Sequence, residues 1–247
     1  MTIGIYGLGR FGVFWGDQLS KVATVKGYSR NSSRVAPSTI KRVSEDEVLS
    51  CDVIVICVAI SAMESFLHNI KDRVKPGTLI MDTCSVKVHP IKLMLDLLPS
   101  SVDIIGTHPM FGPDSGRFGI AGLPIVVSEV RVDKSKYNKW IDLFNSLNLS
   151  VIEMTPQEHD REAAYTQGIT HFIGRTLSDL HLKNSAISTS GYNSLLEIIK
   201  QTCNDEYQLF LDLQKYNSYT SDMRRDLKSS LNKVLGVVEA EISDKER

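Results

Sequence analysis

The chain has 247 residues, of which 42% are hydrophobic, and its formal net charge at pH 7 is -1. This length suits one large domain or two modest ones. The charge balance provides no basic surface for nucleic acid, and no apolar run reaches the roughly 20 residues that a membrane-spanning helix needs. We therefore expect a globular protein that binds neither nucleic acid nor membrane.

Strand-like apolar runs alternate with amphipathic segments through the first part of the chain. We predict strands over residues 2–6, 24–28, 39–43, 52–58, 79–82, 102–107, 124–127 and 150–154. Helices are expected over residues 10–21, 61–73, 88–98 and 134–147. The Val- and Ile-rich runs lack polar alternation, which is typical of strands covered on both faces. The pattern predicts a doubly wound, mainly parallel α/β sheet.

From Thr155 onward the pattern becomes helical. Thr155 suits a helix N-cap, Pro156 the first helical position, and Glu158 the first turn. Helical periodicity follows over residues 159–182, 192–202, 205–218 and 220–242. We therefore divide the chain into domains of residues 1–154 and 155–247. A helical array of about 90 residues is small for an independent core. We expect it to bury its apolar faces in a homodimer.

The four cysteines have no spacing typical of a metal site. They are Cys51, Cys57, Cys84 and Cys203. We expect reduced, mostly buried thiols and no bound metal. The first predicted strand begins almost at Met1, which leaves no room for a targeting peptide. The expected location is the cytoplasm, or a plastid if a transit peptide has been removed.

A glycine-rich motif follows the first predicted strand and opens the first predicted helix. Its residues are Gly7, Leu8, Gly9, Arg10, Phe11 and Gly12, in the pattern GxGxxG. In this context the glycines allow a tight turn, close approach of a pyrophosphate, and helix–strand packing. The helix N-terminus then offers N–H groups to the phosphates. The motif predicts a Rossmann-type dinucleotide-binding domain, with an all-α dimerisation domain after it.

The end of the second predicted strand indicates which dinucleotide binds. Enzymes that prefer NAD usually carry a carboxylate there, but this segment contains Ser29, Arg30, Ser32 and Arg34 instead. A guanidinium suits the 2′-phosphate of NADP, so we expect NADP, with NAD as the second possibility. The alternative is a solvated polar loop. We also assign residues after two neighbouring strands to the cofactor site, namely Val58, Ala59, Thr83 and Cys84.

A lone histidine, His108, follows the apolar run of residues 102–106. Because Pro109, Pro113 and several glycines come next, we predict that the strand stops at this histidine. A titratable group at the carboxyl end of a strand lies where open α/β sheets bind ligands. The alternative is a histidine whose hydrogen bonds are satisfied by the loop backbone.

Several segments together resemble the prephenate/arogenate dehydrogenase family, and plant-type arogenate dehydrogenases most of all. They are the glycine motif and residues 82–87, 106–113, 158–160 and 170–177. The resemblance implies an oxidative decarboxylation of a cyclohexadienyl substrate. In that reaction a hydride leaves C4 for the nicotinamide, the 4-hydroxyl becomes a carbonyl, and loss of carbon dioxide aromatises the ring.

The resemblance also implies roles for individual residues. His108 would accept the proton of the substrate hydroxyl, and Ser85 would lie between that hydroxyl and the nicotinamide; alternatively, Ser85 caps the following helix. His171 would contact the substrate, and Gln167 lies one helical turn earlier. The alternative for His171 is a packed core residue. Gly112 and Pro113 are further substrate-binding candidates. Lys87 is interpreted as an exposed lysine of a helix's first turn or as a ligand contact.

Two positions bear on the choice of substrate. Tyr192 is followed by Asn193, whereas many bacterial prephenate dehydrogenases have an arginine there that reads the substrate carboxylate. Asp205 stands where plant arogenate-specific enzymes carry an acid, which would favour the ammonium of arogenate over the keto group of prephenate. Alternatively, Asp205 is an N-cap. Candidates for the carboxylate-binding cation are Arg175 and Arg117. We assign no chemistry to the pair His159 and Asp160.

The leading interpretation is an NADP-dependent arogenate dehydrogenase, with prephenate dehydrogenase as the alternative. The 3-hydroxyacid dehydrogenases and imine reductases also pair a Rossmann domain with helices. They use a catalytic lysine or another acid on the first long helix, where this chain has Gln167 and His171. A dinucleotide-sensing regulator without turnover is a non-enzymatic alternative, and the presence of both Ser85 and His108 argues against it.

Overall fold

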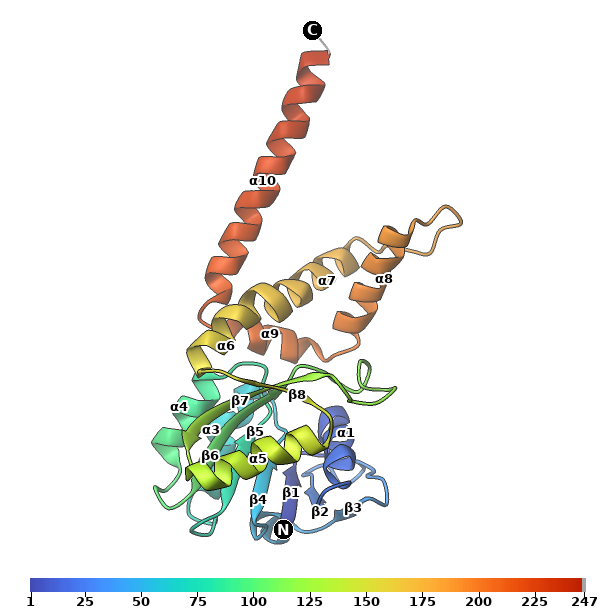
Figure 1. Cartoon of the computed structure of the whole chain (residues 1–247). Coiled ribbons are helices and arrows are strands. Elements are labelled where there is room, and N and C mark those ends of the chain that lie inside the picture. The colour runs from blue at the N-terminus through green and yellow to red at the C-terminus, as the bar shows by residue number, and fades with distance from the viewer. Residues whose placement is uncertain (246–247) are drawn as a thin grey trace. The chain divides into compact units, whose positions relative to one another are not determined.

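The computed structural model describes residues 1–245, and Figure 1 shows their course. The chain divides into two compact units, Met1–His159 and the part from Asp160 onward. The first unit carries the sheet, and the second is helical.

The first unit contains one eight-stranded sheet. Its strands are β1 (Thr2–Tyr6), β2 (Thr24–Tyr28), β3 (Ile40–Arg42), β4 (Val53–Ile56), β5 (Leu79–Asp82), β6 (Asp103–Pro109), β7 (Pro124–Arg131) and β8 (Ser150–Glu153). The strand order is β3-β2-β1-β4-β5-β6-β7-β8. All neighbouring strands are parallel except β6 and β7, which are antiparallel. The predicted fold class is confirmed.

Helices cover both faces of this sheet (Figure 1). They are α1 (Arg10–Leu19), α2 (Glu45–Leu49), the short helix Ile60–Ala62, α3 (Met63–Ile70), α4 (Val88–Leu97) and α5 (Lys134–Ser146). On one face, α1 and α5 contribute Trp15 and Phe144 to an apolar core, with ring centroids 6.3 Å apart. On the other face, α2 packs over β1 and α4 over β6, and α3 packs against α4. Both faces of the sheet are therefore buried, as the uninterrupted apolar sequences of the strands predict.

The sequence patterns missed α2, which begins with a capping box. Ser44 Oγ accepts the Glu47 N–H, and the Glu47 carboxylate accepts the Ser44 N–H. The helix has only five residues, which is too short for periodicity to reveal it. The S-x-x-E spacing was the available signal.

The prediction that the strand stops at His108 is wrong, because β6 continues through His108 to Pro109. Beyond Gly106, the partner of the last residue of β5, only β7 pairs with β6. The N–H of Met110 bonds to β7, so the proline nitrogen faces the opposite side, where β5 has ended. Pro109 therefore costs no ladder hydrogen bond, which is why a strand tolerates it there.

The second unit consists of helices. They are the end of α6 (Pro156–Ala163), a π-helix (Ala164–Gly168), α7 (Ile169–Asp179), α8 (Ser190–Cys203), α9 (Tyr207–Tyr216) and α10 (Thr220–Lys245). As predicted, Thr155 caps α6, and it forms a capping box with Glu158. α7 packs along α8. None of the helices formed by residues 1–245 is both long and apolar enough to cross a bilayer.

Candidate active site

The glycine motif forms the turn between β1 and α1. Gly7 has φ +109°, and a Cβ atom there would lie 2.3 Å from the carbonyl oxygen of Cys57, so only glycine fits. A Cβ atom at Gly9 would meet nothing within 4 Å. Gly9 is also the N-cap of α1, and no side chain caps this helix. The open space and the uncapped helix N-terminus fit a pyrophosphate group.

The other residues of the motif differ in what they offer a ligand. Leu8 is buried in the core, so only its backbone can face a cofactor. Phe11 packs toward Trp15, with ring centroids 6.5 Å apart. Arg10 forms an ion pair with Asp114 at 2.9 Å, which ties the glycine motif to the loop that follows β6.

The loop after β2 carries the residues predicted to select the cofactor. Arg30 and Ser32 are exposed, and Ser29 is half-buried. Sequence reasoning missed Arg42 at the end of β3, which donates hydrogen bonds to the carbonyl oxygens of Asn31 (3.0 Å), Ser29 (3.4 Å) and Arg34. Carbonyl partners carry no formal charge, so they do not neutralise the guanidinium. Arg42 thus shapes this loop and adds positive charge to it.

The strands next to β1 supply the remaining cofactor candidates. Val58 is half-buried and Ala59 exposed, directly after β4. Thr83 Oγ1 donates to the carbonyl of Ile56 at 2.9 Å, and the Cys84 N–H donates to Asp82 at 3.0 Å. Burial raises the pKa of the Cys84 thiol well above its usual value. The thiol is therefore protonated, so it packs as an apolar side chain and is not a nucleophile.

An ion pair is buried beneath the carboxyl ends of β5 and β6. Lys87 and Asp82 are both 0% exposed, and the Lys87 ammonium contacts the Asp82 carboxylate. Lys87 Nζ also donates to the carbonyl of Thr107 at 2.6 Å, and the Thr107 N–H donates to Asp82 at 3.3 Å. The prediction of an exposed Lys87 is wrong. Its cation holds the backbone immediately before His108.

Ser85 lies in the loop between β5 and α4. Its hydroxyl oxygen is buried and has no hydrogen-bond partner within the described part of the chain. Lys87, not Ser85, occupies the N-cap position of α4, so the capping alternative is wrong. A buried hydroxyl without a partner costs free energy unless something else satisfies it, and a bound ligand would do so.

His108 is 3% exposed, and its Nδ1 lies 2.8 Å from Nε2 of His159, which is 2% exposed. The planes of the two rings are inclined at 67°, with centroids 5.0 Å apart. Burial, His159 and Lys87, in that order, hold the pKa of His108 well below its usual value. His108 is therefore a neutral imidazole, and its partner is a second imidazole rather than loop backbone.

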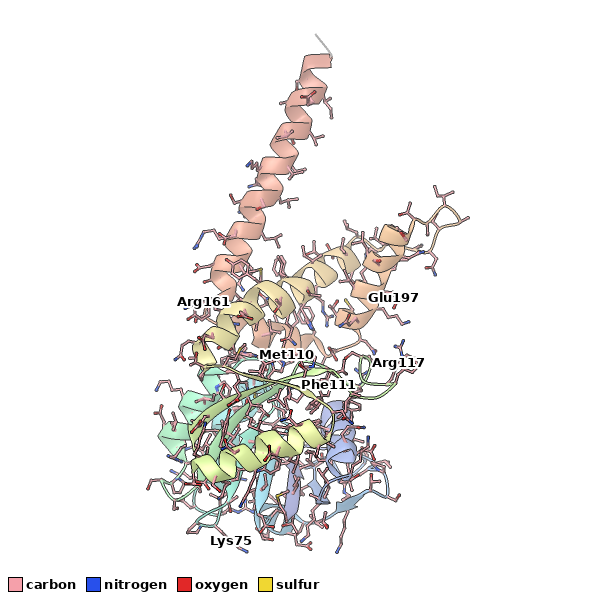
Figure 2. All side chains as sticks on the ribbon, in the orientation of Figure 1. Lys75, Met110, Phe111, Arg117, Arg161 and Glu197 are labelled. Carbon is pink, nitrogen blue, oxygen red and sulfur yellow. The ribbon has the colours of Figure 1, made fainter. Side chains whose placement is uncertain are left out.

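The loop after β6 also carries predicted contacts. Figure 2 shows Met110 and Phe111 at its start, and Phe111 packs against Trp15 at 5.9 Å between centroids. The Gly112 N–H donates to Ser115 Oγ at 2.9 Å, and Pro113 is half-buried. Arg117 is exposed and stacks on the Phe118 ring at 4.7 Å (Figure 2).

The second unit carries three of the predicted substrate residues, Gln167, His171 and Asp205, together with Arg175. Gln167 lies in the π-helix, and His171 and Arg175 follow at four-residue steps on α7. Gln167 Oε1, His171 Nδ1 and Arg175 Nε are buried and lack hydrogen-bond partners among residues 1–245. Buried polar atoms of this kind need a water molecule, an ion or a ligand to satisfy them. π-helices are also frequent at functional sites.

Arg175 links α7 to Asp205. Its Nη2 donates to the carbonyls of Thr202 (3.0 Å) and Asp205 (2.8 Å), and its guanidinium lies over the Tyr207 ring at 5.2 Å. Burial lowers the pKa of His171; Arg175 lowers it further, and Asp205 opposes both. α9 begins at Tyr207 with Glu206 as its N-cap, so the N-cap alternative for Asp205 is wrong.

The mainly parallel sheet and the glycine turn define a Rossmann-type dinucleotide-binding protein. Residues 20–121 match the family model described as prephenate dehydrogenase, nucleotide-binding domain. Residues 176–247 match the TYRAAT1-like, C-terminal domain.

The chain is 38% identical to Arogenate dehydrogenase 1, chloroplastic, of Arabidopsis thaliana over 88% of its length and 36% of that relative. It is 34% identical to Arogenate dehydrogenase 2, chloroplastic, of the same plant, over 88% of its length and 64% of that relative. The chain belongs to the prephenate/arogenate dehydrogenase family.

Solved structures share the fold. Prephenate dehydrogenase from A. aeolicus, solved with hydroxyphenyl propionate and NAD+, has a TM-score of 0.78 at 17% identity, over 98% of this chain and 92% of that one. Synechocystis arogenate dehydrogenase has a TM-score of 0.70 at 18% identity, over 98% of this chain and 93% of that one. The chain spans about a third and just under two thirds of the two Arabidopsis relatives.

Proposed function

We propose that this protein is an NADP-dependent arogenate dehydrogenase, which converts L-arogenate to L-tyrosine with loss of carbon dioxide. The observation that carries the proposal is the buried, neutral His108 near the carboxyl edge of the sheet. The similarity to the Arabidopsis arogenate dehydrogenases supports the substrate class. In this proposal the first unit binds the nucleotide, and the helices bind substrate.

The geometry of the first unit supports the proposed cofactor contacts. Gly7 and Gly9 would admit the pyrophosphate at the N-terminus of α1. Arg30 would bind the 2′-phosphate, and the hydrogen bond of Arg42 to Asn31 would hold the loop that carries Arg30. When bound, NADP supplies the acceptor for the hydride that leaves C4 of the substrate.

The remaining chemistry belongs to the side chains. His108 accepts the proton of the 4-hydroxyl, because its lowered pKa keeps the imidazole neutral and able to act as a base. Ser85 offers its unpartnered hydroxyl to that substrate oxygen and so positions it. Since aromatisation provides a large driving force, the protein mainly orients the substrate and removes one proton.

The test is a steady-state comparison of arogenate and prephenate, each with NAD and with NADP. The proposal expects the highest kcat/KM for arogenate with NADP. Turnover of prephenate in preference to arogenate would assign the protein to the alternative, prephenate dehydrogenase. Cofactor binding without turnover of either substrate would favour a dinucleotide-sensing regulator.

Asp205 is expected to select the ammonium of arogenate. Asp205→Asn removes the charge and keeps the shape, so kcat/KM for arogenate should fall by roughly ten- to hundredfold, given the worth of a charged hydrogen bond. The kcat/KM for prephenate should rise. The matched control is Glu206→Gln, which neutralises the adjacent exposed carboxylate at the N-cap of α9. Equal responses of both substrates would remove Asp205 from the proposed specificity site.

Arg30 is expected to favour NADP over NAD. Arg30→Ala should raise the KM for NADP by about tenfold or more, since a charge-assisted hydrogen bond is worth roughly 1.5–3 kcal/mol. The KM for NAD should hardly change. Lys41→Ala, which removes an exposed cation from β3, serves as the control for general loss of positive charge. A wild type that prefers NAD would contradict the proposed role of this loop.

We propose that a second copy of this chain covers the apolar face of α10. Leu231, Val234, Leu235, Val238 and Ile242 are each about half exposed or more, at spacings of one helix face. An obligate homodimer of this kind buries upwards of about 2,000 Å². Static light scattering at low micromolar concentration should therefore give the dimer mass. Val238→Glu should shift the mass toward the monomer, and a monomeric wild type would contradict the proposal.

A further inference from the structure

The His108–His159 contact joins two elements that are far apart in the sequence. His108 lies on β6, and His159 lies in the first turn of α6, whose start is held by the Thr155–Glu158 capping box. Both rings are almost fully buried, and the nitrogen atoms are 2.8 Å apart. The proposed reaction so far assigns nothing to His159.

The contact restricts where protons can sit. A neutral imidazole has one N–H donor and one acceptor nitrogen. If His108 Nδ1 carries the proton and donates to His159, then His108 Nε2 has a free lone pair. If His159 Nε2 donates instead, His108 must carry its proton on Nε2, which then cannot accept a proton from a substrate. The direction of this hydrogen bond therefore decides whether His108 is a base.

We propose that His159 is a positioning residue, whose Nε2 accepts the Nδ1–H of His108 and fixes the tautomer that leaves His108 Nε2 free as the base. This inference rests on the proposed role of His108. It follows the general arrangement in which a base is oriented by a third group. When His108 Nε2 takes the substrate proton, the O–H bond of the 4-hydroxyl breaks as the Nε2–H bond forms, and the imidazolium keeps its Nδ1–H hydrogen bond to His159.

The surroundings of His108 suit a neutral partner. The Lys87 ammonium lies beneath the preceding carbonyl, that of Thr107, and is paired with Asp82. Burial, His159 and Lys87 all lower the pKa of His108, so a charge on the His108 imidazole is disfavoured. A neutral acceptor orients His108 without adding charge, whereas a carboxylate partner would favour the protonated base.

The first test needs no substrate. Imidazole ¹⁵N NMR of the full-length protein at pH 8 distinguishes the two tautomers, with His108→Asn used to assign the His108 signals. We expect the Nδ1–H tautomer of His108. Observation of the Nε2–H tautomer would overturn the inference. Because the measurement is made without turnover, its result is independent of whether the proposed dehydrogenase activity is found.

The second test compares two substitutions at one position. His159→Gln keeps an acceptor near the position of Nε2, whereas His159→Leu removes it. His159→Leu should lower kcat by about a hundredfold, as misorientation of a reacting group does, with little change in KM. It should also abolish the single His108 tautomer. His159→Gln should restore most of kcat and the Nδ1–H tautomer. Equal losses in both variants, in proteins that still bind NADP, would make His159 a packing residue and overturn the inference.

Discussion

Replacement of His108 with Asn is expected to lower kcat by about 10²–10⁴-fold, the usual loss when a general base is removed. Asn keeps a hydrogen-bonding side chain beside His159, but it cannot take a proton at neutral pH. The affinity for NADP should change little, because the proposed phosphate contacts lie at the glycine motif and the β2 loop. Steady-state kinetics together with NADP titration by fluorescence separate the two effects.

The control for this substitution is His68→Asn, since His68 is an exposed histidine on α3. It should leave kcat unchanged. Activity of His108→Asn at the wild-type level would remove His108 from the mechanism. Loss of NADP binding together with activity would point instead to a structural role for His108.

The pH dependence of kcat/KM carries a further expectation for His108. Its pKa is lowered by burial, by His159 and by Lys87, so the base stays neutral below the ordinary imidazole pKa of 6.5. The acid limb of the profile should therefore lie below that value. The same shift affects stability, because His108 binds a proton near pH 6.5 in the unfolded chain but only at lower pH in the folded protein. Stability is fully present above the unfolded pKa and is lost as the pH falls toward the lowered pKa.

Replacement of Lys87 with Met is expected to destabilise the fold by about 3–5 kcal/mol, the typical cost of leaving one member of a buried ion pair alone. Asp82 would then keep its carboxylate fully buried without its cation, and Thr107 would lose the hydrogen bond to its carbonyl. Urea unfolding followed by circular dichroism measures the change.

Two further variants serve as controls for Lys87→Met. Lys92→Met breaks the exposed pair with Asp96 on α4 and should cost much less, because water screens that pair. The double variant Lys87→Met, Asp82→Asn removes both charges and should recover much of the stability lost in Lys87→Met. If Lys87→Met lowers the free energy of unfolding by less than about 1 kcal/mol, the ion pair is accessible to water, because a buried unpaired charge would cost more.

Several features were predictable because they depend on local chemistry. The strands β1, β2 and β5 begin and end at the predicted residues, since strand patterns and turn residues act over a few positions. The glycine motif indicated a nucleotide turn, because positive φ and an uncapped helix start are properties of that short segment. The Thr155 cap was readable for the same reason.

The amino-acid sequence by itself thus determined the fold class, the nucleotide turn and the family. Only the tertiary structure decided that Lys87 is buried, that β6 runs past His108 and that His159 faces it. Lys87 contacts Thr107, 20 positions away, His108 contacts His159, 51 positions away, and β6 continues because it pairs with β7, and no local pattern records such contacts. In the fold, Lys87 becomes half of a buried ion pair, and His159 becomes the partner of a second buried histidine. Both outcomes depend on what the fold places around those side chains.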